Sequence, residues 1–213
     1  MSINKKGWEL FDKIYCLNQD SRPDRWAQAK AEFDRVGVNV ERIAAIPADQ
    51  PNKSFCLSQY AMLKTFLQTG GRTLLTFEDD VLFRDTTHLE AALKELPADW
   101  DIVYLGANIT DMVFGIKENP PAKYSDHLYR VRKAWTTHAI GYSRGIIERI
   151  VAEYPVHSFE MYDNWLNSEI LPTSNAYLIN PMVCWQRPGK SDLWGQETDY
   201  TGAFIHGDKI MCV

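Results

Sequence analysis

Short β-rich runs alternate with helical segments along the first part of the chain, and this alternation restricts the possible folds most. The β-rich runs lie at residues 13–18, 41–46 and 73–77; helical patterns follow the turn at 20–25 through about residue 36, and again at 58–69. A helical crossover favours parallel pairing of the strands that it joins. We therefore expect an α/β fold in one domain spanning residues 1–213, with a mostly parallel, twisted central sheet flanked by helices.

The rest of the chain continues this pattern less regularly. Further strands are predicted at residues 101–106, 128–135, 137–143 and 176–186, helices at 146–152 and 162–168, and an irregular tail after them. In open α/β sheets, ligands bind beyond the carboxyl ends of the strands. Residues that directly follow Asn18, Ile46, Phe77 and Leu105 are therefore expected to line a site.

The charge balance excludes two classes of partner. The chain has 23 Lys and Arg against 28 Asp and Glu, so no overall positive field attracts nucleic acid or an anionic membrane. The first residues lack the apolar run of a secretory signal, and no segment is long enough to cross a bilayer, so we expect a cytoplasmic protein without a membrane span. The separated cysteines Cys16, Cys56, Cys184 and Cys212 are expected to be reduced, buried thiols.

Three carboxylates, Glu78, Asp79 and Asp80, follow directly after the apolar run at residues 73–77. Their repulsion must be offset by solvent or by a cation. Charged runs usually open a solvated turn, but apolar residues flank this triplet on both sides, which favours a metal site. Because side chains alternate along an extended backbone, Glu78 and Asp80 are expected to point to one side and share a cation, with Asp79 on the other side.

The end of the chain contains a further candidate ligand. His206 can coordinate a cation through its neutral imidazole, and Lys209 can reach a phosphate as a point charge. A histidine near a terminus is equally often an exposed residue without a role. A mixed carboxylate and imidazole set suits Mn²⁺ or Mg²⁺ better than structural zinc. We therefore predict a Mn²⁺ (or Mg²⁺) site formed by Glu78, Asp80 and His206.

Six motifs follow one another along most of the chain. They are IYCLNQDSRPDR at 14–25, CLSQ at 56–59, LTFEDDV at 75–81, WDIVYLG at 100–106, YDNWL at 162–166 and QRPGKSDL at 186–193. This ordered set resembles the family 25 glycosyltransferases, which include lipopolysaccharide and collagen sugar transferases, although Gln59 stands where the family has a histidine. The His206-Gly207 pair is similar to the histidine-glycine-lysine ending of glycogenin-type transferases. A single domain of this kind is also similar to glycosylation enzymes of large algal DNA viruses.

The resemblance implies a GT-A fold, a UDP-sugar donor, Mn²⁺ and a glycan or glycoprotein acceptor. The donor is expected to contact residues from these motifs and from the tail: Leu17, Asn18, Asp20, Arg22, Arg25, Ser58, Glu78, Asp79 and Lys209. Sugar transfer requires stabilisation of the departing diphosphate, which a cation provides as a Lewis acid and Arg22, Arg25 and Lys209 can supplement. Each arginine has an equal alternative as a helix-surface residue or as a partner of a neighbouring aspartate.

Two aspartates are candidates for the catalytic base. An inverting transfer needs a carboxylate that takes the proton of the acceptor hydroxyl. Asp163 is the first candidate, because the adjacent rings of Tyr162 and Trp165 can stack on a sugar, and Asp192 in the turn at 188–192 is the second. Asp163 can equally cap a helix, and Asp192 can equally be an ordinary loop residue.

Two other functions are compatible with the sequence. A metal-dependent phosphohydrolase also places aspartates after a parallel strand, but the aspartyl-phosphatase type needs two aspartates one residue apart, and Glu78 or Val81 takes one of those positions here. A non-catalytic sugar- or calcium-binding module would use some of the 7 Trp and 10 Tyr for stacking, although most of these are expected in the core. Binding of a nucleoside diphosphate argues against such a module.

Overall fold

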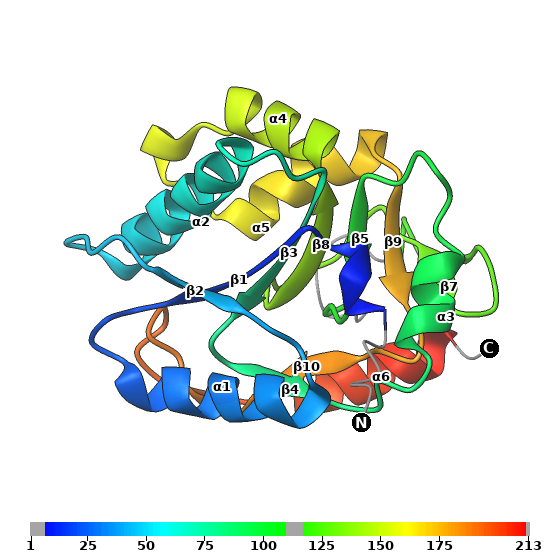
Figure 1. The fold of residues 1–213 in the computed structure, drawn as a ribbon, viewed down its shortest axis with the longest axis horizontal. Coiled ribbons are helices and arrows are strands. Elements are labelled where there is room, and N and C mark those ends of the chain that lie inside the picture. The colour runs from blue at the N-terminus through cyan, green and yellow to red at the C-terminus, as the bar shows by residue number, and fades with distance from the viewer. Residues whose placement is uncertain (1–6, 110–116, 212–213) are drawn as a thin grey trace.

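The computed structural model describes residues 7–109 and 117–211 and is built around an 8-stranded twisted sheet (Figure 1). The strands of this sheet are β1 (Lys13–Asn18), β2 (Glu41–Ala44), β3 (Thr73–Glu78), β5 (Ile102–Tyr104), β6 (Ala122–Lys123), β7 (Leu128–Arg130), β8 (Ala139–Ser143) and β9 (Ala176–Ile179). Their order is β2-β1-β3-β8-β5-β9-β7-β6. β7 and β8 run opposite to the other six strands, which share one direction. The predicted mostly parallel sheet is therefore confirmed.

Two helical crossovers explain the parallel part of the sheet. α1 (Pro23–Val36) connects β1 to β2, and α2 (Pro51–Leu67) connects β2 to β3. Both helices begin with a proline, at a position where the missing N–H has no partner to lose. The predicted start of the second helix at residue 58 is therefore late, because Pro51 opens the helix instead of belonging to the preceding turn.

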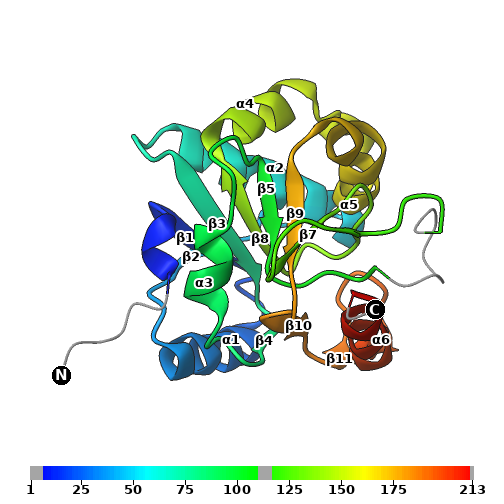
Figure 2. The same cartoon turned by 90° about the vertical axis from the view of Figure 1, so that its right-hand side faces the viewer.

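Helices cover both faces of the sheet (Figure 1, Figure 2). α2, α4 (Arg144–Glu153) and α5 (Tyr162–Trp165) lie on one face, α1 and α3 (Leu89–Lys94) lie on the other, and α6 (Thr201–Met211) packs beside residues 184–186. Successive residues of β3 divide between the two cores: Leu74 packs in the cluster that includes α2 and α4, and Leu75 in the cluster that includes α1 and α3. A strand covered on both faces reads as a continuous apolar run, as residues 73–77 do.

A second, 2-stranded sheet joins two segments that are far apart in the sequence, and it lies under the main sheet in the view of Figure 1. β4 (Val81–Phe83) pairs antiparallel with β10 (Cys184–Gln186), which places Gln186 opposite Val81. The predicted strand at 176–186 is thus divided into β9 and β10, with Pro181, which cannot donate to a ladder, between them. A hairpin of β11 (Gly189–Lys190) and β12 (Glu197–Thr198) follows directly. This arrangement brings the segment after Gln186 back to the acidic triplet.

Two predictions of local structure are wrong. The strand predicted at 128–135 is limited to β7, and the tail predicted to be irregular forms α6. Gly202 and Gly207 weaken the helical signal of the tail, but the buried ring of Phe204 stacks on Trp185 with centroids 6.0 Å apart. Tertiary packing therefore stabilises a helix that propensity alone does not favour.

Gly106 allows a close backbone contact behind β10. A Cβ atom at this position would lie 1.9 Å from the carbonyl oxygen of Cys184 and 3.0 Å from Nε2 of His138. We expect Gly106→Ala to lower the free energy of unfolding by about 3 kcal/mol, because the added methyl group must displace backbone. Urea denaturation measures this. The control is Gly145→Ala in α4, where a Cβ meets nothing within 4 Å, and equal stability of the two variants would contradict the expectation.

No helix within residues 7–109 and 117–211 combines the length and apolarity that a membrane crossing requires. The thiols of Cys16, Cys56 and Cys184 are free and buried, as predicted, and Cys212 lies outside the described residues. The cytoplasmic location expected from the sequence stays a prediction.

Candidate active site

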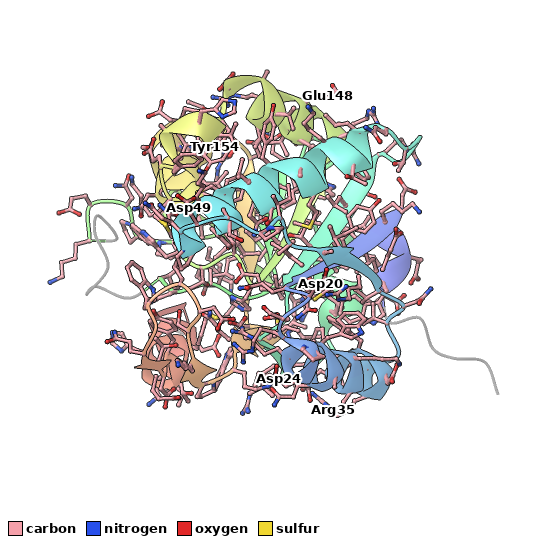
Figure 3. All side chains as sticks on the ribbon, turned by 90° about the vertical axis from the view of Figure 1, so that its left-hand side faces the viewer. Asp20, Asp24, Arg35, Asp49, Glu148 and Tyr154 are labelled. Carbon is pink, nitrogen blue, oxygen red and sulfur yellow. The ribbon has the colours of Figure 1, made fainter. Side chains whose placement is uncertain are left out.

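A cleft of about 710 Å³ opens where β1, β2 and β3 end. Its volume lies in the range of small-molecule sites, roughly 300–1,000 Å³. Its wall comes from the loops after β1 and β2, the first half of α2, the acidic triplet, the segment before β8, the start of α5 and the β11–β12 hairpin. Figure 3 faces this side of the molecule, with Asp20 after β1, Asp24 in α1 and Asp49 before α2.

Ten of the 13 predicted site residues line this cleft: Leu17, Asn18, Arg22, Arg25, Ser58, Glu78, Asp79, Asp80, Asp163 and Asp192. Asp20 does not, because its side chain, 78% exposed, turns outward to an ion pair of 2.6 Å with Arg42. The expectation that the ends of neighbouring strands converge on one site therefore holds for most of the set.

His206 and Lys209 also lie outside the lining of the cleft. The prediction that His206 joins the acidic triplet in a metal site is therefore corrected. Both side chains are exposed on α6. Phe204 faces the core, and a residue two positions later lies about 200° further around the helix. The helical conformation of the tail therefore turns His206 toward solvent.

The acidic triplet spans the end of β3 and the turn that follows. β3 ends at Glu78, so the backbone is no longer extended at the next two residues, and the predicted alternation is wrong. Arg25 binds both aspartates: its Nε lies 2.7 Å from Asp79 Oδ1 and its Nη2 lies 2.7 Å from Asp80 Oδ2. Asp79 and Asp80 therefore face one guanidinium group.

Asn18 fixes the second oxygen of Asp79. Its Nδ2 donates to Asp79 Oδ2 at 2.7 Å, and its Oδ1 accepts a hydrogen bond of 2.8 Å from Arg42 Nε. Burial raises the pKa of Asp79, while Arg25 and Asn18 act in the opposite direction. Because both oxygens already have partners, Asp79 serves to hold Arg25 in place.

Glu78 lies at the end of β3, against the segment that leads into β8. The Thr137 hydroxyl donates a hydrogen bond to its carboxyl group, and its backbone N–H donates to the His138 carbonyl at 3.0 Å. Burial and the negative charge of Asp80 raise the pKa of Glu78 to about 8. Burial thus favours the neutral form of this carboxyl group, and a cation beside it would favour the charged form.

Two oxygen atoms of the cleft lining are buried without a hydrogen-bond partner: Asp80 Oδ1 and Gln186 Oε1. The two side chains touch, since Gln186 Nε2 donates to Asp80 Oδ2 at 2.9 Å. Buried polar atoms without partners are rare, and a bound ligand is one explanation for them. Carboxylate and amide oxygens are ligands that Mg²⁺ and Mn²⁺ accept, so these residues fit such a cation.

The protein side chains do not form a complete metal site by themselves. In the described part of the chain, no three His, Cys, Asp or Glu side chains group as a metal site requires. Acidic residues nevertheless outnumber basic ones in the cleft lining by 7 to 4. An anionic ligand that enters this cleft therefore needs a cation with it, and its own oxygen atoms can complete the coordination.

Asp192 pairs with arginine. Its two carboxylate oxygens lie 2.5 Å and 2.7 Å from Arg22 Nη1, and Arg25 Nη1 lies 3.6 Å from Oδ2. A catalytic base needs a carboxylate oxygen that is free to reach the acceptor hydroxyl, and both oxygens here already have an arginine partner. The structure therefore does not support Asp192 as the catalytic base, and shows instead that it ties the β11–β12 hairpin to the start of α1.

We expect Asp192→Asn to strengthen the binding of a diphosphate in the cleft about threefold or more, because it removes a charged partner from Arg22 Nη1, which can then bind a phosphate oxygen. Isothermal titration at low salt measures this. Asp34→Asn, on the exposed side of α1, is the matched control. A loss of kcat of about 100-fold in Asp192→Asn, as expected for a missing base, would instead restore its predicted role.

Ser58 and Leu17 belong to the wall beside the ends of β1 and β2. The Ser58 hydroxyl donates to the Ser54 carbonyl at 2.6 Å and accepts from the Ile46 N–H at 2.8 Å. It therefore fixes the loop that enters α2, and Leu17, Ala45 and Phe55 make the adjacent surface apolar. A flat aromatic ring fits a surface of this kind.

Asp163 lies at the start of α5 and lines the cleft. Its Oδ1 accepts a hydrogen bond of 2.8 Å from the Asn164 N–H, so it satisfies one N–H group of the first turn of α5 without being its N-cap residue. Burial raises the pKa of Asp163, and the backbone N–H groups of Asn164 and Thr136 partly oppose this. A carboxylate with a raised pKa in a cleft has the properties of a general base.

The rings predicted to stack on a sugar are not available for it. Tyr162 and Trp165 are buried in the core, with 0% and 4% of their surface exposed. The aromatic residues that line the cleft include Trp135, Tyr200 and Trp194, none of which the sequence patterns marked.

Other lining residues absent from the prediction are Gln186, Thr137 and Asn108. Gln186 had one local signal, since it ends a short apolar run directly before the turn-forming Arg187-Pro188-Gly189. Thr137 is the first residue of the strand predicted at 137–143, and Asn108 follows the strand predicted at 101–106, but nothing local distinguishes either residue from its neighbours. Their place in the cleft depends on contacts between distant segments.

No protein-family model matches this chain, and no curated protein matches it by sequence. Solved structures do match. One is A197 from STIV, with a TM-score of 0.52 and 14% identity over 86% of this chain and 91% of that chain. Another is a glycosyltransferase involved in the glycosylation of the major capsid of PBCV-1, with a TM-score of 0.50 and 10% identity over 94% of this chain and 100% of that chain.

These likenesses concern the fold, because the identities are low. They confirm the predicted GT-A-like α/β fold. The galactosyltransferase LgtC in complex with donor and acceptor sugar analogs also matches, with a TM-score of 0.47 and 12% identity over 92% of this chain and 95% of that chain, which is too distant to support an argument. Membership of family 25 and a viral origin stay predictions.

Proposed function

We propose that this protein is a glycosyltransferase that moves a sugar from a UDP-sugar to a hydroxyl group of a glycan or glycoprotein, with Mn²⁺ or Mg²⁺ as cofactor. The observation that carries the proposal is the pair of buried, unpartnered oxygens of Asp80 and Gln186 in a cleft that also contains the Asp163 carboxylate. The GT-A-like fold supports it, since the site lies at the strand ends where such folds bind ligands.

The donor would lie along the β1 and β2 ends of the cleft. Asp80 and Gln186 would hold the cation, with Glu78 beside them, and the bound cation would supply Lewis-acid stabilisation of the leaving diphosphate. Arg22 and Arg25 would add positive charge once their carboxylate partners give way. The apolar wall at Leu17 and Phe55 would face the nucleoside.

The acceptor would enter at the Asp163 end. In an inverting transfer, the acceptor hydroxyl oxygen forms the new bond to the anomeric carbon of the donor sugar as the bond from that carbon to the diphosphate oxygen breaks. The Asp163 carboxylate would take the hydroxyl proton. Trp135 and Tyr200 offer partly buried rings for the apolar face of an acceptor sugar.

The test is a screen of nucleotide sugars with Mn²⁺, with and without saccharide acceptors, in which the released nucleotide and inorganic phosphate are both measured. The proposal expects release of UDP from a UDP-sugar, faster with an acceptor, and none without a divalent cation. Phosphate release from phosphomonoesters without UDP release would indicate the phosphohydrolase instead. Saccharide binding without any turnover or nucleotide binding would indicate the sugar-binding module.

A further inference from the structure

Thr136, in the wall of the cleft, has a backbone conformation that threonine rarely adopts. Its φ angle is 71°, in the left-handed region. A β-branched side chain is disfavoured there because its Cβ substituents crowd the backbone. Such residues persist where the surrounding structure fixes them, and they are found preferentially at functional sites. The contacts of Thr136 and its neighbours therefore bear on the role of this conformation.

A buried histidine fixes the Thr136 side chain. His138 Nε2 lies 3.4 Å from the Cys184 carbonyl oxygen, and its Nδ1 lies 3.0 Å from Thr136 Oγ1. Because a carbonyl oxygen only accepts, Nε2 carries the proton, and Nδ1 accepts from the threonine hydroxyl. The His138 ring is fully buried against Phe204, and burial lowers its pKa to about 4. A neutral imidazole in one tautomer is thus a permanent acceptor for Thr136.

Residues 134–138, which we name the strap, are attached at one end to the helix that carries Asp163. The amide of Asn167, 3% exposed, donates from Nδ2 to the carbonyl oxygens of Ala134 and Asp163, each at 2.8 Å. Its Oδ1 accepts from the Ala134 N–H at 2.8 Å. One buried side chain therefore joins the strap directly to the turn of helix at Asp163.

The other end of the strap is attached to the acidic triplet. The Thr137 hydroxyl donates to the Glu78 carboxyl group, and the His138 carbonyl accepts from the Glu78 N–H at 3.0 Å. Between the two attachments, Thr136 and Asp163 both line the cleft, and the Thr136 N–H acts to lower the pKa of the Asp163 carboxyl group. The strap is thus a short physical connection between Asp163 and the acidic triplet.

We propose that the strap sets the position of Asp163 relative to the acidic triplet, and that Thr136 is a positioning residue whose left-handed conformation directs its N–H to the Asp163 carboxylate. This role rests on the proposed function, in which Asp163 is the base. It predicts that the conformation at position 136 matters more than the side chain itself.

Two substitutions separate conformation from side chain. Thr136→Val keeps the size and branching but loses the hydroxyl that holds the residue, so the strap should relax toward ordinary φ values. Thr136→Gly adopts the left-handed conformation without steric cost and keeps the N–H. We expect Thr136→Val to lower kcat about 30-fold or more with the donor KM within about twofold, and Thr136→Gly to stay within about threefold of the wild type. Equal losses in both variants, or full activity of Thr136→Val, would overturn the proposal.

A second readout does not depend on transferase activity. In protein with ¹³C-labelled aspartate carboxyl groups, NMR titration should show a higher pKa of Asp163 in Thr136→Val than in the wild type and Thr136→Gly, because the N–H that favours the charged form has moved away. An unchanged pKa in Thr136→Val would overturn the proposal even if no sugar transfer is found, and a raised one would support it. If circular dichroism shows that Thr136→Val does not fold, Thr136→Ala replaces it with the same expected order.

Discussion

Asp80→Asn is expected to lower kcat for sugar transfer about 1,000-fold or more. The change removes the charge of the carboxylate whose Oδ1 is buried without a partner, and with it a main ligand of the proposed cation. Loss of a cation's stabilisation of the diphosphate costs several kcal/mol in the transition state, and about 1.4 kcal/mol corresponds to each factor of ten. Initial-rate kinetics at saturating donor measures the effect.

The control for this change is Asp34→Asn, which removes a carboxylate from an exposed i,i+4 pair with Lys30 on α1. It tests whether the loss of an exposed negative charge on a surface helix of the same protein has the same effect. Retention of more than a tenth of the wild-type kcat by Asp80→Asn would show that this carboxylate does not hold a catalytic cation.

Asp163→Asn has the second large expected effect. A missing general base typically lowers the rate about 100- to 10,000-fold, and the donor affinity should remain within about twofold because Asp163 is not among the residues proposed to hold the diphosphate. Steady-state kinetics together with titration of the donor nucleotide separates these two quantities. A large loss of donor affinity with an unchanged kcat would contradict the assignment of Asp163 as the base.

The pH dependence of the wild type adds an independent check on the same residue. The base must be charged to accept a proton, and burial raises the pKa of Asp163 above the ordinary value. The rate should therefore rise with pH through this raised pKa and fall as pH drops below it. In Asp163→Asn the residual rate should no longer fall at low pH. If the rate of this variant still falls there, another group is responsible for the pH dependence.

The parallel half of the fold and the place of the site were predictable from local patterns. Helices between β1, β2 and β3 favour parallel pairing, and both faces of β3 are covered, so its apolar run and the carboxylates after it mark a buried strand end at the site. These features depend on periodicity within ten or twenty residues. Local sequence carries that information directly.

Features that depend on contacts between distant segments were not predictable. Gln186 reaches Asp80 only because β10 pairs with β4, and His206 turns away because Phe204 anchors α6 against Trp185. The direction of the Asp79 side chain likewise follows from the turn after β3 and from Arg25. Each of these outcomes is decided by tertiary packing that no short motif encodes.

The most direct test of the cation and donor site is calorimetric titration of UDP into the wild type and Asp80→Asn, each with and without Mn²⁺. The proposed site predicts that Mn²⁺ strengthens UDP binding at least about tenfold in the wild type, and that Asp80→Asn removes this gain. Equal UDP affinity with and without Mn²⁺ in the wild type, or an undiminished Mn²⁺ effect in Asp80→Asn, would contradict a cation held at Asp80 and Gln186.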